Sequence, residues 1–300
     1  MKTPPYLQKG DSIAIVAPAR SVIIEEMLPA ITLFEEWGLK VVLSKHLFAV
    51  QNQFAGTEEE RAEDFQTMLD DDEIKAIICA RGGYGVVRII DLLNFDHFIQ
   101  QPKWIVGYSD VTVLHSHIHS CFSIETLHAT MPINVYANPN YESTESLYDA
   151  LFGKPLTYQI PTASNSRVGE GKGELIGGNL SILYSLSATD SDIDTTGKIL
   201  FIEDLDEYLY HIDRMIQNLK RSVKLNHLSG LIIGGLTEMR DNTIPFGETA
   251  EEIITNAIAE YNYPVCFGFP AGHGDDNRAL IFGREVSLTV TKETSELTFI

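Results

Sequence analysis

Short apolar runs alternate along the chain with longer segments in which apolar residues recur at helical spacing. The short runs are typical of buried strands and the longer segments of amphipathic helices. In the first half, strands are predicted over 12–17, 40–43, 74–80 and 104–106, and helices over 23–37, 57–69, 86–93 and 110–121. Thr57 and Glu60 have the spacing of a capping box at the start of the second helix. Strands separated by such helices predict right-handed crossovers and a mainly parallel sheet.

The second half also alternates predicted strands with predicted helices, but its last part contains predicted strands only. Strands are predicted over 173–177, 198–202, 230–233 and 265–269, and helices over 180–187, 207–220 and 248–260. The last part of the chain has three β-like runs without intervening helices, over 279–282, 286–290 and 297–300. Strands joined by such short connections pair antiparallel.

Between the two halves, the segment 136–174 is rich in Asn, Ser, Thr, Pro and Gly. Such a composition is typical of a connection, and we predict a linker over 161–173. The predicted fold is therefore α/β. Residues 1–160 form a mainly parallel sheet domain flanked by helices, and residues 174–300 form a smaller α/β domain that ends in antiparallel strands.

The charge of the chain limits its partners. Its 300 residues include 22 Lys and Arg against 42 Asp and Glu, a net charge of −20. Nucleic acids and anionic lipids are recognised by clustered cations, so neither is an expected partner. No apolar stretch has the roughly 18 residues needed to span a bilayer, and no secretory signal pattern opens the sequence. We expect a cytoplasmic protein without membrane contact; its oligomeric state, a homodimer included, stays open.

Ser109 is the sharpest candidate for chemistry, because it lies between a short apolar strand and a helix. This placement resembles a nucleophile elbow, although Val111 replaces the final glycine of that motif. The amide of Asp110 opens the helix and has no partner within it, so it could bind an oxyanion. Taken alone, the pattern is more typical of an ordinary helix N-cap formed by Ser109 or Asp110.

Other polar groups follow neighbouring strands, and ligands bind at the carboxyl ends of parallel strands. Gly82 and Gly83 allow a backbone to approach a ligand closely and could supply a second oxyanion amide, or form a plain tight turn. His273, between two glycines, suits proton transfer, or is a solvated surface histidine. Glu203 ends an apolar strand and could orient that imidazole, or stabilise the start of the next helix.

Metal and thiol chemistry are the alternatives. His115 and His119 share a helix face, but no acidic residue lies between them in the manner of a zinc-peptidase motif. His273 could form a metal cluster with Asp275 and Asp276, although no second histidine is near in sequence. Cys79, as the nucleophile of an amidotransferase-like enzyme, would lie within a strand and not at an elbow. We expect neither a metal nor a cofactor.

Taken together, these segments resemble the LD-carboxypeptidase family of serine peptidases, which includes the microcin self-immunity proteins. Three matching segments surround the candidate residues: 104–110 the serine, 201–204 the glutamate and 268–274 the histidine. The glycine-rich turn 80–85 matches too, and the family similarity extends to the segments 9–18 and 177–180. The resemblance covers nearly the whole chain, from about residue 10 to residue 283. It implies a Ser-Glu-His triad and argues against a non-catalytic binding module.

The resemblance also implies roles and a reaction. Ser109 would be the nucleophile, His273 the base and Glu203 its partner, with oxyanion amides from Asp110 and from Gly82 or Gly83. The implied reaction releases a C-terminal D-amino acid, typically D-alanine from a small murein tetrapeptide during cell-wall recycling. Arg81 is the nearest cation for the terminal carboxylate. The alternative is hydrolysis of peptidyl- or aminoacyl-nucleotide antibiotics, as in the self-immunity branch.

Overall fold

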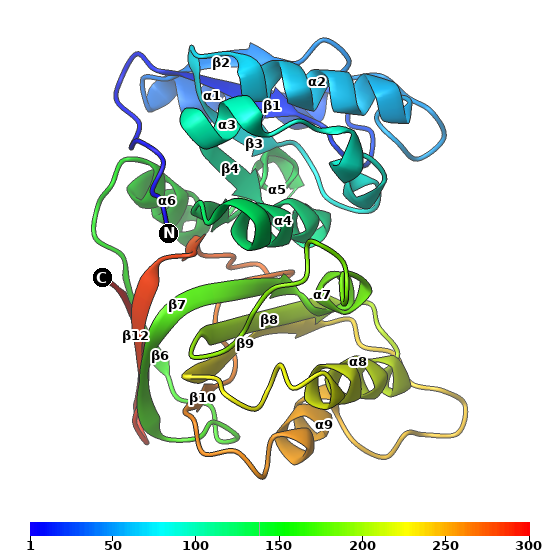
Figure 1. Ribbon diagram of the computed structural model, residues 1–300, viewed down its shortest axis with the longest axis vertical. Helices are drawn as coiled ribbons and strands as arrows, with labels where there is room; N and C mark the ends of the chain where they lie inside the picture. The colour runs from blue at the N-terminus through cyan, green and yellow to red at the C-terminus, as the bar shows by residue number, and fades with distance from the viewer. Residues whose placement is uncertain (138) are drawn as a thin grey trace.

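The computed structural model describes residues 1–137 and 139–300, which form two β-sheets, one above the other in Figure 1. The first sheet has the strand order β11-β5-β4-β3-β1-β2. Its strands are β1 (Ser12–Val16), β2 (Lys40–Leu43), β3 (Ile74–Cys79), β4 (Trp104–Gly107), β5 (Thr126–His128) and β11 (Leu280–Phe282). Strands β1 to β4 pair parallel, as predicted. Strand β5, which the sequence did not predict, also pairs parallel, and β11 pairs antiparallel with it.

Helices cover both faces of this sheet (Figure 1). They are α1 (Ile24–Glu36), α2 (Glu58–Asp70), α3 (Asp96–Gln100), α4 (Thr112–Phe122), α5 (Pro132–Ala137) and α6 (Tyr141–Leu151). The capping box of α2 is confirmed, because the Glu60 amide donates to Thr57 Oγ1 and the Thr57 amide donates to Glu60 Oε2. The helix predicted over 86–93 is instead two 3-10 turns, a form usual for segments this short.

The second sheet has the order β10-β9-β8-β7-β12-β13-β6. Its strands are β6 (Thr157–Pro161), β7 (Gly169–Asn179), β8 (Ile199–Leu205), β9 (Gly230–Thr237), β10 (Val265–Cys266), β12 (Glu285–Val290) and β13 (Thr294–Phe299). Strands β7 to β10 pair parallel, and β12 and β13 pair antiparallel, as predicted. Strand β6 was not predicted and also pairs antiparallel. The run 279–282, expected in this second domain, instead forms β11 of the first sheet. Its helices are α7 (Leu180–Ser185), α8 (Leu209–Arg221) and α9 (Ala250–Ala257).

The structure differs from the predicted linker over 161–173. Residues 169–173 are the first part of β7, because they pair with β12 along its whole length. Strand β6, placed before the linker, pairs with β13 in the second sheet. The glycines at 169, 171 and 173, which indicated a connection, are strand residues. At Gly171 a Cβ would lie 2.0 Å from the Ser229 carbonyl oxygen, so the close approach of the backbone explains its glycine.

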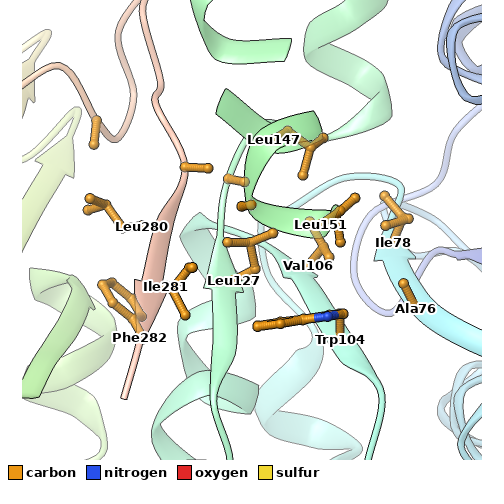
Figure 2. Packing of buried hydrophobic residues seen from close by; sticks show 14 of the residues in the cluster. Ala76, Ile78, Trp104, Val106, Leu127, Leu147, Leu151, Leu280, Ile281 and Phe282 are labelled. Carbon is orange, nitrogen blue, oxygen red and sulfur yellow. The ribbon is translucent and has the colours of Figure 1, made fainter. Parts of the chain in front are cut away.

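The two sheets share a core. A single cluster of buried residues includes Trp104 and Leu127 of the first sheet and Phe201 and Ile232 of the second. Figure 2 shows Ile281 of β11 beside Leu127 of β5, with Leu280 and Phe282 on the other side of β11. Helix α4 lies between the sheets (Figure 1), where the Asn179 amide donates to Thr112 Oγ1 at 3.0 Å. This packing brings the carboxyl ends of β4 and β8 to the same region.

No helix in the described part of the chain combines the length and the apolar character that crossing a bilayer would require.

Candidate active site

Ser109 opens a 3-10 turn, Ser109–Val111, that joins β4 to α4. Its φ is 64°, in the left-handed region, which costs a residue other than glycine about 1–3 kcal/mol and is typical of functional sites. At Gly107 a Cβ would lie 2.9 Å from a Val111 methyl group, so this glycine lets the turn fold back closely on the strand. The sharp turn leaves the Ser109 side chain half-buried at the end of β4.

The glycine-rich turn after β3 lies directly against Ser109. A Cβ on Gly82 would lie 2.8 Å from Ser109 Cβ and 3.0 Å from its Oγ, closer than side chains tolerate. Gly83 has φ 115°, and a Cβ there would meet the Arg20 side chain at 2.5 Å. The structure therefore brings Gly82 against Ser109, as a backbone approach to a reacting atom requires, and places the next residue, Gly83, against Arg20.

Asp110 contributes more than the amide that the sequence indicated. Its carboxylate is buried and accepts the Val86 amide at 2.8 Å, so it ties the glycine-rich turn to the turn of Ser109. Burial raises the pKa of Asp110, whereas the Val86 hydrogen bond and the Arg61 charge act in the opposite direction. The Asp110 N–H lies in the first turn, where amides lack a helical acceptor. Asp110 therefore combines a structural carboxylate with an available amide.

Glu203 and His273 form a buried pair. Glu203, near the end of β8, is 0% exposed, and its Oε2 accepts the His273 ring Nδ1–H at 2.6 Å and the His273 backbone amide at 3.2 Å. Gly272 makes this approach possible, because its φ is 103° and a Cβ there would lie 2.7 Å from Glu203. With Nδ1 occupied by Glu203, Nε2 is the nitrogen left to accept a proton.

The Glu203 carboxylate also decides the protonation of His273. Burial alone lowers the pKa of the imidazole, but the charge of Glu203 and its hydrogen bond outweigh that effect. Asp204 and Glu238 add smaller contributions in the same direction. The net result is a His273 pKa above its usual value, so the imidazolium form is stabilised.

Tyr108 connects the serine side of the site to the histidine side. The centroid of its ring lies 4.8 Å from that of the His273 ring. It also lies 5.7 Å from the centroid of the His128 ring. Among the described residues, no hydrogen bond joins Ser109 Oγ to His273. The structure thus brings the residue before Ser109 into contact with the His273 ring, and the hydrogen bond of the expected triad between Ser109 and His273 is not formed.

Three further residues of the site were not predicted to have a role from the sequence. His128 ends β5, is fully buried, and has a pKa far below the usual value because of that burial. Asp204 is buried beside Glu203, and burial raises its pKa to about 7 although Asn179 donates to it. Asn277 accepts the Gly272 amide at 2.8 Å. Nothing in the sequence shows that these polar residues are buried, so only their contacts in the structure identify them.

Two arginines lie near the glycine-rich turn. Arg81 directly follows Ala80 at the end of β3 and is half-buried, and the exposed Arg20 packs its stem on Gly83. Among the described residues, neither guanidinium takes part in an ion pair. Arg20 follows β1, and β1 lies beside β3 in the sheet. The sequence does not show that these two strands are neighbours, so it gave no reason to place Arg20 near the glycine-rich turn.

The metal and thiol alternatives find no support in these contacts. His115 donates from Nε2 to the Gly107 carbonyl oxygen, and His119 Nε2 contacts Thr126 Oγ1, so both buried rings have protein partners. Asp276 pairs with Arg278. Within the described residues, no group of three His, Cys, Asp or Glu side chains could hold a metal. Burial raises the pKa of the Cys79 thiol, which keeps it protonated and unreactive.

The arrangement combines a strained serine, a histidine whose Nδ1 is held by a carboxylate, and backbone amides beside the serine. These are the parts that acyl transfer through a covalent serine intermediate requires. A phosphate-binding role fits poorly, because the glycine-rich turn is not followed by the Lys and Ser or Thr of a P-loop.

Comparisons with known proteins agree with this chemistry. Residues 13–129 match the model of the LD-carboxypeptidase N-terminal domain, and residues 172–288 match that of the C-terminal domain. A probable murein peptide carboxypeptidase of Bacillus subtilis is 34% identical over 97% of this chain and 93% of its own. The murein tetrapeptide carboxypeptidase of Pseudomonas aeruginosa is 27% identical, with 92% of each chain covered.

Two proteins of lower identity also match over nearly the whole chain. The microcin self-immunity protein MccF of Escherichia coli is 24% identical over 97% of this chain and 94% of its own. The crystal structure of a muramoyltetrapeptide carboxypeptidase from Oxalobacter formigenes has the same fold, with a TM-score of 0.88, 24% identity and coverage of 96% and 98% of the two chains. The chain therefore belongs to the LD-carboxypeptidase family of serine peptidases.

Proposed function

We propose that this protein hydrolyses the amide bond between an L-configured centre and a C-terminal D-amino acid, releasing D-alanine from murein tetrapeptides in cell-wall recycling. The observation that carries the proposal is the buried Glu203–His273 pair, joined at 2.6 Å, beside the strained Ser109. The relatives named as murein peptide carboxypeptidases support the choice of substrate class.

In this mechanism, Ser109 Oγ attacks the scissile carbonyl carbon while His273 Nε2 takes its proton, and Glu203 stabilises the imidazolium that forms. The Asp110 amide and an amide of Gly82 or Gly83 bind the developing oxyanion. The tetrahedral intermediate then breaks its C–N bond, and His273 protonates the leaving amine. Water, activated by His273, finally hydrolyses the acyl-enzyme and frees Ser109.

A carboxypeptidase must also bind the terminal carboxylate, and the structure offers two cations for it. Arg81 comes from the same turn as Gly82, and Arg20 packs on Gly83. A guanidinium can bind a carboxylate through two parallel hydrogen bonds. We propose that one or both of these arginines hold the carboxylate of the leaving D-alanine.

Hydrolysis of aminoacyl-nucleotide antibiotics is the second candidate, because the MccF relative spans nearly the whole chain. Both reactions use the same serine and differ in the group attached to the carbonyl. A guanidinium binds a phosphate as readily as a carboxylate, so the arginines beside Gly83 fit either leaving group, and the more similar relatives named as murein peptide carboxypeptidases favour the peptide substrate.

The two functions are separated by offering the purified protein three compounds: a murein tetrapeptide ending in D-Ala, the same peptide ending in L-Ala, and a peptidyl-adenylate. We expect mass spectrometry to detect release of D-Ala only. Arg20→Gln and Arg81→Gln should lower kcat/KM for the free acid more than for its C-terminal amide. Cleavage of the adenylate with an intact tetrapeptide would overturn the proposal.

A further inference from the structure

The loop that carries His273 is closed by its own hydrogen bonds. The Arg278 amide donates to the Pro270 carbonyl oxygen at 2.9 Å, which joins the two ends of the loop. Within it, Asn277 Oδ1 accepts the Gly272 amide at 2.8 Å. Gly272 is the residue whose left-handed backbone lies against Glu203. Asn277 therefore holds the backbone at the point that determines how His273 meets Glu203.

Helix α6 holds this loop from outside. The Asn277 amide donates to Ser143 Oγ at 2.8 Å, and the Ala279 amide donates to Ser146 Oγ at 2.9 Å. Both serines are buried, 3% and 6% exposed. Unpaired buried amides are costly, so these two hydroxyls fix where the loop runs.

The two serines occupy unusual positions on the helix. The buried stripe of α6 continues with Leu147, Ala150 and Leu151, at the spacing of an amphipathic helix. Its first two members, where an aliphatic residue is usual, are Ser143 and Ser146. Since both hydroxyls accept amides of the His273 loop, the contacts explain the polar residues in this stripe.

The apolar end of α6 rests on the sheet that carries Ser109. Figure 2 shows Leu147 and Leu151 beside Val106 of β4 and Leu127 of β5, and all four belong to one buried cluster. One helix therefore contacts the strand that leads to Ser109 and also the loop of His273. Residues 141–151 lie between the two matched family domains, 13–129 and 172–288, and belong to neither.

We propose that α6, acting through Ser143 and Ser146 on Asn277 and its loop, is a positioning element that sets His273 relative to Ser109. The inference rests on the proposed function, because it concerns the same site. The serines touch neither substrate nor reacting atoms; they act through the backbone of the loop. A misplacement of about 1 Å at a reacting group can lower a rate roughly 100-fold, so small loop movements would be measurable.

The test compares the parent with the double variant Ser143→Ala, Ser146→Ala. We expect kcat for D-Ala release to fall by about 10-fold or more, with KM changed less than about 3-fold, since substrate contacts remain. A looser Glu203 contact should also lower the pKa of His273, measured by NMR titration of its ring. Thr144→Ala is the matched control, because Thr144 Oγ1 donates only within the start of α6.

Ser143→Thr, which keeps the hydroxyl, should restore most of the activity that Ser143→Ala loses. If the double variant does not fold, the single variants replace it, each removing one acceptor. A lower melting temperature with parental kcat and parental His273 pKa would overturn the inference and leave α6 a purely structural helix. If the parent cleaves no peptide, the proposed function fails, and the NMR titration alone still decides whether α6 positions His273.

Discussion

Ser109 and Glu203 both have features that lower the stability of the folded protein. Ser109 has a left-handed backbone, and Glu203 is a carboxylate with no exposed surface. A buried charge is tolerated where it is paired and hydrogen-bonded, and His273 supplies both a ring and a backbone donor. Strain and buried charge at the same place are typical of a site selected for chemistry and not for stability.

Replacing Ser109 with alanine should separate catalysis from folding. The change removes one hydroxyl from a turn, and an N-cap role would cost about 1 kcal/mol of stability while activity persists. We expect instead an almost unchanged melting temperature and a rate of D-Ala release lower by several orders of magnitude. A Ser109→Ala protein that still cleaves at a near-parental rate would remove this serine from the mechanism.

The raised pKa of His273 predicts the pH dependence. The imidazole acts as a base only when neutral, so kcat/KM should rise with pH through the raised His273 pKa and then level off. In Glu203→Gln the carboxylate charge is lost and burial dominates, so this rise should move to lower pH. The variant should retain about 10- to 100-fold more activity than Ser109→Ala. An unmoved profile in Glu203→Gln would contradict the pairing.

The groups proposed for catalysis are a serine, an imidazole and backbone amides, all from this chain. We therefore expect D-Ala release to continue at the parental rate after treatment with EDTA and removal of the chelate. His115 and His119 keep their partners, Gly107 and Thr126, in this scheme. Loss of activity on chelation that zinc restores would bring a metal mechanism back.

At the scale of elements, the site is built from strand ends and glycine-containing loops. Strands β3 and β4 end at the glycine-rich turn and at Ser109, and β8 ends just after Glu203. Gly82 and Gly272 are required for different contacts, the first against Ser109 and the second against Glu203. The loops therefore approach the site closely because these positions lack a Cβ.

Gly272→Ala should be far more damaging than Gly274→Ala. At Gly272, with φ 103°, the new Cβ would lie 2.7 Å from Glu203, whereas at Gly274 its nearest neighbour would be 3.9 Å away. We expect Gly272→Ala to lose about 1–3 kcal/mol of stability and most activity, and Gly274→Ala to resemble the parent. Chemical denaturation and peptide cleavage measure both effects, and equal behaviour of the two variants would refute the contact.

At the scale of the whole molecule, the two sheets are interlocked. Residues 280–282 come late in the chain, yet they form the edge strand of the first sheet. Phe282 is fully buried there and contacts the rings of Phe201 and His128. The buried cluster that includes Phe282 and Phe201 spans both sheets. The relative position of Ser109 and His273 therefore depends on packing that neither half supplies alone.

Phe282→Ala should test this interlocking. Removing a fully buried aromatic side chain costs about 3–5 kcal/mol, and we expect denaturant unfolding to remain a single transition at a lower midpoint. Val50→Ala, at a position 67% exposed, is the control and should change little. Two separate transitions in Phe282→Ala would show that the sheets unfold independently.

The sequence by itself determined the features that depend on nearby residues. Alternating apolar runs predicted the parallel strands of both halves except the short β5. Thr57 with Glu60 predicted the start of α2. Strands and caps follow from local periodicity and side-chain reach. The motif around Ser109 indicated a turn for the same reason. The family resemblance added roles for Glu203 and His273 that spacing alone left open.

The tertiary structure decided everything that depends on distant segments. The contact of Glu203 with His273 joins residues 70 positions apart, and Ser143 reaches Asn277 across 134 positions. The place of β11 in the first sheet and the strand character of residues 169–173 likewise follow from their pairing partners. Local propensity carries no information about such partners, because the free energy that selects them comes from burying whole faces of the sheets and helices together.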